Sequence, residues 1–128
     1  MSNLDKKIVL IVDDTAANIT LLNNLLRTKY KIRAAPSGER ALELAHKEPR
    51  PDLILLDVMM PEMDGFEVCR QLKTDPETAQ IPVIFVTGKD DAKDEQEGMS
   101  LGAVGYLQKP INLKLVLELL EQQLASRA

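Results

Sequence analysis

Short apolar runs alternate with helix-like segments along this chain, and this alternation restricts the fold more than any other feature. The strongest runs are Ile8–Val12, Leu53–Leu56 and 83–86, which are apolar throughout. Runs of this length are too short for buried helices and are typical of strands that are covered on both faces. Two weaker runs, Lys31–Ala35 and 103–107, complete a set of five predicted strands.

Each predicted strand is followed by a segment whose apolar residues have helical spacing. The first such segment begins after Asp14 and Thr15, and Ser37 can cap the second. All seven prolines fall at predicted boundaries, as expected for a residue that interrupts helices and strands. The residues that define the apolar faces are Leu21, Leu22, Leu25, Leu26, Leu42, Ala45, Phe66, Cys69, Leu72, Leu113, Val116, Leu117, Leu120 and Leu124.

Five strands that alternate with five helices predict an α/β fold with a parallel sheet and helices on both faces. Right-handed crossover connections make this a doubly wound fold. The length of 128 residues, without an internal repeat or linker, predicts a single domain over residues 1–128.

The composition argues against several classes of function. A net charge of −4 is the opposite of the basic excess common in nucleic-acid-binding proteins. One cysteine excludes an internal disulfide, and one histidine excludes a metal centre with several histidines. No apolar run approaches the roughly 20 residues that span a bilayer, and the first residues lack the pattern of a signal peptide. We therefore expect a cytoplasmic protein that does not bind membranes or nucleic acid directly.

The candidate functional residues are those that follow the predicted strands. In open α/β sheets, ligands bind outside the carboxyl ends of the strands. Asp13 and Asp14 follow the first strand, Asp57 the third, Thr87 the fourth and Lys109 the fifth. A single aspartate in this position is most often a turn or capping residue. Five such side chains on one edge are better explained by a shared site.

Three carboxylates in one place require a counter-charge. Two carboxylates about 4 Å apart repel by roughly 4 kcal/mol at an effective dielectric constant near 20. Oxygen ligands select a hard cation, and an incomplete, exposed set of them suits Mg²⁺. A carboxylate beside such an ion can attack phosphorus, and an ammonium and a hydroxyl can bind the phosphoryl oxygens. The pattern thus predicts a phosphoryl-acceptor site.

These motifs resemble the receiver domain of response regulators, the CheY-like switch of two-component signalling. The resemblance rests on Asp13–Asp14, residues 53–65 around Asp57, Thr87–Gly88 and Lys109–Pro110, and it covers essentially the whole chain. It implies a flavodoxin-like (βα)5 fold with strand order 2-1-3-4-5.

The resemblance also implies roles for the carboxylates. Asp57 would accept a phosphoryl group from a phosphohistidine of a sensor histidine kinase or a phosphotransfer protein. Asp14, Asp57 and the backbone carbonyl of Met59 would bind Mg²⁺ directly, and Asp13 would act mainly through water. The protein would be a signalling switch that catalyses its own phosphorylation and dephosphorylation, not an enzyme with turnover.

Further roles follow from the same resemblance. Lys109 would pair with the phosphoryl oxygens, and its bond to Pro110 is expected to be cis. Thr87 and Tyr106 would form a switch pair, in which Thr87 moves toward the phosphoryl group and Tyr106 turns inward.

Two segments suggest how the switch could act. The last helix carries a second apolar pair, Leu115 and Leu119, opposite its core stripe. Scattered exposed leucines are common, but the pair could also contact a second receiver or an effector domain. The fourth helix has few apolar anchors, of which Ala92 and Met99 stand out, so we expect it to be easily displaced.

Two other residues have simpler interpretations. His46 is expected at the surface, and Cys69 is expected to pack in the core. Met59 and Lys89 flank the path of the hydrolytic water in the related family. Neither side chain is suited to orient that water, which predicts slow loss of the phosphoryl group.

Two rival functions fit the fold less well. A flavin-binding flavodoxin needs a hydroxyl- and glycine-rich loop after the first strand, where this chain has Asp13 and Asp14. A hydrolase that uses an aspartyl phosphate needs an acid or base just after the nucleophile, where this chain has Val58 and Met59.

Overall fold

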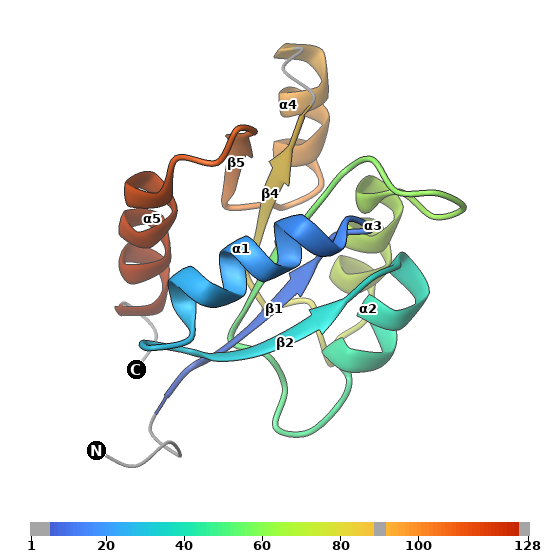
Figure 1. The fold of residues 1–128 in the computed structure, drawn as a ribbon. Coiled ribbons are helices and arrows are strands. Elements are labelled where there is room, and N and C mark those ends of the chain that lie inside the picture. Colours follow the sequence, from blue (N-terminus) through green and yellow to red (C-terminus); the bar gives the residue numbers. More distant parts are fainter. Residues whose placement is uncertain (1–5, 89–91, 126–128) are drawn as a thin grey trace.

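Five parallel strands form one sheet with helices packed on both faces (Figure 1). The computed structural model describes residues 6–88 and 92–125. The strand order is β2-β1-β3-β4-β5, which confirms the doubly wound α/β fold. In chain order the elements are β1 (Ile8–Val12), α1 (Ala16–Leu26), β2 (Lys31–Ala35), α2 (Gly38–Ala45), β3 (Leu53–Leu56), α3 (Gly65–Thr74), β4 (Val83–Thr87), α4 (Ala92–Ser100), β5 (Gly105–Gln108) and α5 (Leu113–Ala125).

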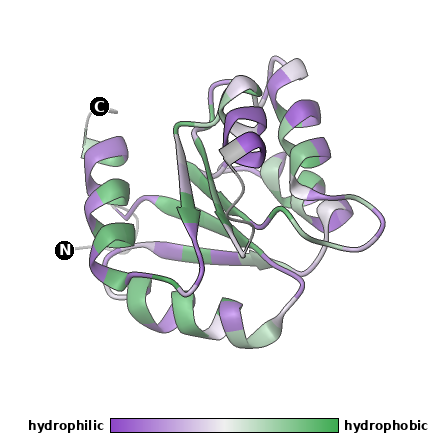
Figure 2. Ribbon diagram, turned by 90° about the horizontal axis from the view of Figure 1, so that it is seen from above, coloured by the Kyte–Doolittle hydropathy of each residue, from purple (hydrophilic) through white to green (hydrophobic). Residues whose placement is uncertain are grey.

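The core has two parts, one on each face of the sheet. Successive side chains of a strand point to opposite faces. Leu10 and Val12 of β1 therefore join the apolar cluster under α2 and α3. Val9 and Ile11 join the cluster under α1 and α5. The hydropathy view shows apolar strands between helices whose polar residues lie mainly on the outside (Figure 2). The two covered faces explain why the central strands are apolar without alternation.

Two helices begin at the side-chain caps that their sequences provide. The Ser37 hydroxyl accepts a hydrogen bond from the Arg40 N–H at 3.2 Å, as predicted for the start of α2. The Asp64 carboxylate accepts one from the Glu67 N–H at 2.9 Å and so caps α3. A side-chain acceptor at this position stabilises a helix by about 1 kcal/mol relative to alanine.

The fifth strand begins later than predicted. It spans Gly105–Gln108, and its register places Tyr106 beside Phe85. Ala103 is buried before the strand begins, while Val104 is 37% exposed. The predicted strand 103–107 was shifted because Ala103 packs against the core before the strand begins.

Some of the predicted apolar faces are too wide. Leu22 and Leu26 of α1 are buried, but Leu21 is 45% exposed. In α5, Leu113 lies outside the core and is 40% exposed. Each helix has a core-facing stripe too narrow to bury every apolar residue at its edges.

The predicted second apolar face of α5 is wrong in one of its two residues. Leu115 is 45% exposed, as expected. Leu119 instead packs against the core, because Gly105 leaves room for it. A Cβ atom on Gly105 would lie 2.9 Å from Leu119 Cδ2. Only Leu115 therefore remains as an exposed apolar residue of this pair.

The anchoring of α4 also differs from the expectation. Met99 is 42% exposed and anchors the helix poorly. The close approach is made by Gly98, where a Cβ atom would lie 3.0 Å from two atoms of the Phe85 ring. Lys89 lies outside the described residues. His46 is exposed and Cys69 is buried, as predicted. Among the described residues, no helix combines the length and apolarity needed to cross a membrane.

Candidate functional site

Main-chain hydrogen bonds hold the first residue after β1, β3 and β5 at the carboxyl end of the sheet. The Asp57 N–H donates to the Val12 carbonyl at 2.9 Å, and the Lys109 N–H donates to the Thr87 carbonyl at 2.8 Å. The Asp13 N–H donates to the Ala35 carbonyl at 3.1 Å. The backbone pairing of the sheet thus continues one residue past the strands and fixes the positions of these side chains.

The three aspartates predicted to share a site do meet. Asp13, Asp14 and Asp57 each offer a carboxylate oxygen, and these oxygens lie within 4.8 Å of one another. Asp13 and Asp57 are 3% and 4% exposed, whereas Asp14 is exposed to solvent. The cluster is an all-oxygen donor set, buried on one side and open on the side of Asp14, which could hold a metal ion.

Lys109 supplies the positive charge of the site. Its ammonium lies 2.9 Å from Asp13 Oδ2 and 3.5 Å from Asp57 Oδ2. The lysine side chain is 21% exposed, so its charge is only partly screened by water. The sequence placed this lysine at the correct edge, and the structure adds that it bridges two of the three carboxylates.

Asp57 is held in an environment that opposes its negative charge. Burial raises the pKa of its carboxyl above the usual value of 3.8, and the charge of Asp13 raises it further. Lys109 and the Met59 N–H, which donates to Asp57 Oδ1 at 3.3 Å, act in the opposite direction. A carboxylate kept poor in hydrogen bonds and near a cation is suited to react as a nucleophile or to bind a metal.

The loop after Asp57 is held tightly against the end of β3. The Gly65 N–H donates to the Val58 carbonyl at 2.8 Å. A Cβ atom at Gly65 would lie 2.1 Å from the Asp57 carbonyl oxygen, so the close approach requires glycine. Glu62 has a positive φ of 69° in the same loop. This tight return leaves the Met59 side chain 58% exposed beside the carboxylates.

The predicted switch residues lie on the adjacent strands. Thr87 is fully buried at the end of β4. Tyr106 is half-buried, and its ring centroid lies 6.0 Å from that of Phe85. Phe85 in turn makes an edge-to-face contact with Phe66, at 5.4 Å between centroids. A row of aromatic rings therefore joins β5 to α3 behind the site. The bond between Lys109 and Pro110 is cis, as expected.

A groove of about 590 Å³ lies next to the site, between helix α4 and the loop that follows β3. Five of its eight lining residues are apolar, and the other three, Asp64, Asp94 and Glu97, give it a negative charge. The two residues from α4 were not identified from the sequence. They belong to a solvated acidic helix, and no motif places that helix beside the loop. The full lining is Val58, Met59, Met60, Pro61, Asp64, Phe66, Asp94 and Glu97.

Comparison with known proteins agrees with this geometry. The sequence model of the response regulator receiver domain matches residues 9–121. A probable cyclic di-GMP phosphodiesterase of Vibrio cholerae is 48% identical over 116 residues, which are 91% of this chain and 26% of that protein. The response regulator PleD of Caulobacter vibrioides is 43% identical over 132 aligned positions, which cover 92% of this chain and 29% of PleD. The chain therefore spans less than a third of the length of these two relatives.

Solved structures show the same fold. A putative response regulator from Chloroflexus aurantiacus superposes with a TM-score of 0.88 at 32% identity. The alignment covers 94% of this chain and 99% of that one.

Proposed function

Because this chain belongs to the family of response regulator receiver domains, we propose that Asp57 is its phosphoacceptor. The donor is a phosphohistidine on a sensor histidine kinase or a phosphotransfer protein. The observation that carries this proposal is the position of Asp57. Its carboxylate is buried between two other aspartates and lies 3.5 Å from the Lys109 ammonium.

The donor set fits Mg²⁺. Asp14, Asp57 and the backbone carbonyl of Met59 would hold the ion directly, and Asp13 would bind it mainly through water. All of these are hard oxygen ligands, and the open side at Asp14 leaves room for water and a phosphoryl oxygen. When bound, the ion supplies positive charge that offsets the charge of the phosphoryl oxygens.

The chain's own residues supply the rest of the reaction. A carboxylate oxygen of Asp57 forms the new bond to phosphorus. The phosphorus–nitrogen bond to the donor imidazole breaks, and the imidazole keeps the electron pair. Lys109, already 3.5 Å from the Asp57 oxygen, donates to the transferred phosphoryl group. In this sense the domain catalyses its own phosphorylation, and water later removes the group.

Phosphorylation then shifts an existing equilibrium between two conformations. Thr87 ends the strand beside the acceptor and moves toward the phosphoryl group, and Tyr106 turns inward. α4 is the third part of the switch. It is held by the close contact of Gly98 with Phe85, while its larger apolar residue Met99 is exposed. A helix with so little buried side-chain surface is displaced at low cost.

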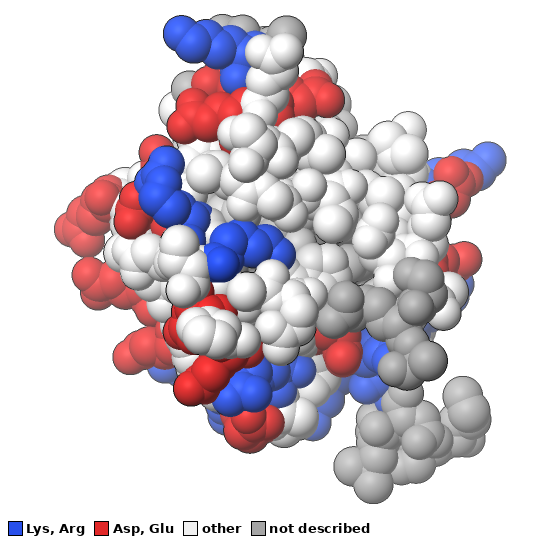
Figure 3. Space-filling view, turned by 180° about the vertical axis from the view of Figure 1, so that it is seen from behind, with Lys and Arg blue, Asp and Glu red and all other residues white. Residues whose placement is uncertain are grey.

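The output surface is the outer side of the last helix. Leu115 is 45% exposed and is not part of either core cluster. The face shown in Figure 3 carries acidic side chains around α4 at its top, and a broad area without charged side chains extends below α4. A second receiver domain or an effector domain would bind through exposed apolar residues of this kind.

The experiment is the intact mass of the protein after incubation with acetyl phosphate and Mg²⁺. We expect the wild type to gain one phosphoryl group, and to gain none when EDTA removes the metal. Asp57→Asn should gain none under either condition. Asp64→Asn is the matched control, because it removes a nearby carboxylate while asparagine still caps α3. A phosphoryl group on Asp57→Asn, or none on the wild type, would contradict the proposal.

A further inference from the structure

A second hollow lies at the amino-terminal end of the strands, whereas Asp57 lies at their carboxyl end. It has a volume of about 330 Å³ and lies where α1 ends and where β1 and β2 begin. We call it the cationic pocket. Its lining is Lys6, Asn23, Arg27, Tyr30, Lys31 and Ile32.

The charge around this pocket is opposite to that of the whole protein. The chain carries a net charge of −4. Residues 15–33 nevertheless contain four basic residues, Arg27, Lys29, Lys31 and Arg33, and no acidic one. Every second residue from 27 to 33 is basic. A local excess of this kind attracts anions.

Two of these four cations are engaged by other groups, and two are not. Lys29 pairs with Glu121 at 2.8 Å. The Arg33 guanidinium donates to the Lys47 carbonyl at 3.1 Å. Within residues 6–88 and 92–125, the side chains of Arg27 and Lys31 have no hydrogen bond and no ion pair. Those are the two that line the cationic pocket.

Tyr30 adds a donor that is otherwise unused. The residue is only 8% exposed. Its hydroxyl has no hydrogen-bond partner in the described part of the chain and reaches solvent, so it is free to donate to a ligand in the pocket that Tyr30 lines. Burial and the nearby charge of Glu121 raise the pKa of Tyr30 above 10.0, so the hydroxyl keeps its proton.

We propose that the cationic pocket binds a small phosphate-bearing anion. A guanidinium fork, two ammonium groups, a side-chain amide and a phenol are the donors that phosphate oxygens accept from. The volume lies at the lower end of the range for small-ligand sites. This site is separate from the phosphoacceptor, which lies at the other end of the strands and is acidic.

A simpler explanation is that the cations neutralise the carbonyl end of α1. It accounts for Lys6, whose ammonium lies 3.5 Å from the Arg27 carbonyl. It does not account for Lys31, which is the first residue of β2, or for the Tyr30 hydroxyl. An anion that contacts all three groups accounts for each of them.

The test is calorimetric titration of Asp57→Asn with pyrophosphate and with adenosine monophosphate, in EDTA. This background removes the phosphoacceptor and the metal from the measurement. We expect saturable binding of at least one probe with one site per chain. Arg27→Gln with Lys31→Gln should weaken it at least about tenfold, as expected when charged donors are lost. Tyr30→Phe should weaken it less, without loss of the fold.

The matched control is Lys29→Gln with Arg33→Gln. It removes the same charge from the same segment, but from side chains that point to other partners. We expect its affinity to stay within about twofold of the parent, because diffuse charge is largely screened by salt. Equal weakening in both double variants, or no saturable binding of either probe, would overturn the proposal. Sedimentation with anionic vesicles is the third arm. Pocket-dependent binding to vesicles but to neither free probe would assign the site to lipid headgroups and overturn the small-ligand proposal.

Discussion

The carboxylate of Asp13 and the ammonium of Lys109 lie 2.9 Å apart, although 96 positions separate the two residues in the chain. The contact joins the end of β1 to the end of β5, across the intervening strands β3 and β4. Lys109 is also 3.5 Å from Asp57 and thus faces both buried carboxylates of the cluster. This single cation offsets the mutual repulsion that would otherwise oppose the folding of the site.

Replacement of Lys109 by methionine should therefore destabilise the protein. The change leaves two buried carboxylates without their cation. Loss of one partner from a buried ion pair costs about 3–5 kcal/mol, and we expect about 2 kcal/mol here because Lys109 is partly exposed. The measurement is the free energy of unfolding in urea, in EDTA. Addition of Mg²⁺ should restore part of the loss.

Asp57→Asn provides the opposite control. It removes one of the repelling charges instead of the compensating one. Because the folded-state pKa of Asp57 is raised, the native state disfavours its ionised form at neutral pH. Asp57→Asn should thus be at least as stable as the wild type in EDTA. Equal destabilisation by both substitutions would show that the ion pair does not determine the stability of the site.

A second prediction concerns the loop after the phosphoacceptor. Gly65→Ala would place a Cβ atom 2.1 Å from the Asp57 carbonyl oxygen, so the loop must move. We expect a loss of stability of about 2–3 kcal/mol, at the upper end of typical overpacking costs. Phosphorylation by acetyl phosphate should slow as well. Gly88→Ala is the control, because no atom of the described residues lies within 4 Å of a Cβ there, and its effect should be small. Equal effects of the two substitutions would contradict this assignment.

The sheet and the position of the site at the carboxyl ends of its strands could be predicted from the sequence for the same reason. Buried parallel strands are apolar throughout, as in β1, and the residue that follows such a strand lies at the ligand-binding edge. Contacts between elements that are far apart in the chain leave no such pattern in the sequence. The pairing of His46 with Asp75 joins residues 29 positions apart in two polar segments. Leu119 was assigned to the wrong face because Gly105, on another element, makes room for its side chain.

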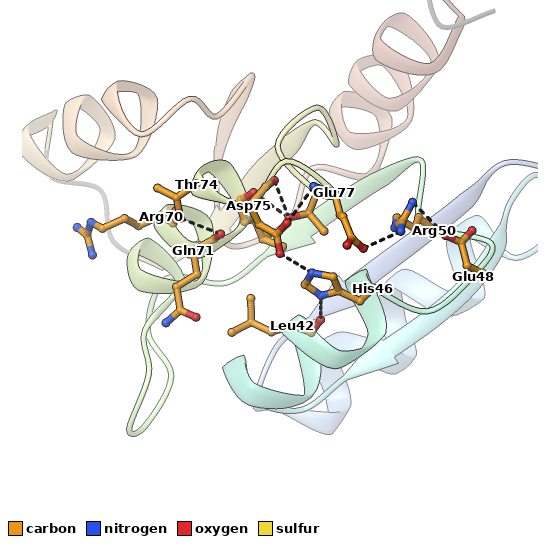
Figure 4. A network of polar contacts seen from close by, with 11 residues as sticks. Leu42, His46, Glu48, Arg50, Arg70, Gln71, Thr74, Asp75 and Glu77 are labelled. Atoms are coloured by element: carbon orange, nitrogen blue, oxygen red, sulfur yellow. Dashed lines mark hydrogen bonds and ion pairs between the residues drawn. The ribbon is translucent and has the colours of Figure 1, made fainter.

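The pairing of His46 with Asp75 should make the stability of the protein depend on pH. His46 Nδ1 lies 2.8 Å from the Leu42 carbonyl, and Nε2 lies 2.6 Å from Asp75 Oδ2 (Figure 4). Both ring nitrogens face acceptors, so the imidazolium is the form that satisfies both. The Leu42 carbonyl and then the Asp75 carboxylate raise the pKa of His46 above 6.5. The Glu77 N–H and His46 lower the pKa of Asp75 below 3.8.

The sign of the effect follows from these two directions. The stability that protonated His46 contributes is full below its usual pKa and is lost as pH rises through the raised value. The contribution of Asp75 persists above its usual pKa and is lost only in stronger acid. His46→Gln should therefore lower the urea midpoint more at about pH 5.5 than at about pH 9. Both side chains are partly exposed, which limits the size of the effect.

Lys47→Gln is the control for this measurement. It removes a neighbouring exposed positive charge and leaves both hydrogen bonds of His46 in place. Its effect on the urea midpoint should be small and similar at both pH values. If His46→Gln lowers the urea midpoint equally at both pH values, the pairing of His46 with Asp75 does not contribute in the way that its geometry indicates.

The last prediction separates surface from core on α5. Leu115→Glu changes a residue that is 45% exposed, and we expect the free energy of unfolding to change by no more than about 0.5 kcal/mol. Leu119→Glu places a charge against Gly105 and the core, and should cost about 3 kcal/mol or more. Association is then measured by light scattering, with and without beryllofluoride and Mg²⁺. If the outer side of α5 contacts a second receiver, the activated wild type increases in mass and folded Leu115→Glu does not. An unchanged mass of the wild type on activation, or association that survives Leu115→Glu, would exclude this surface as the contact between receivers.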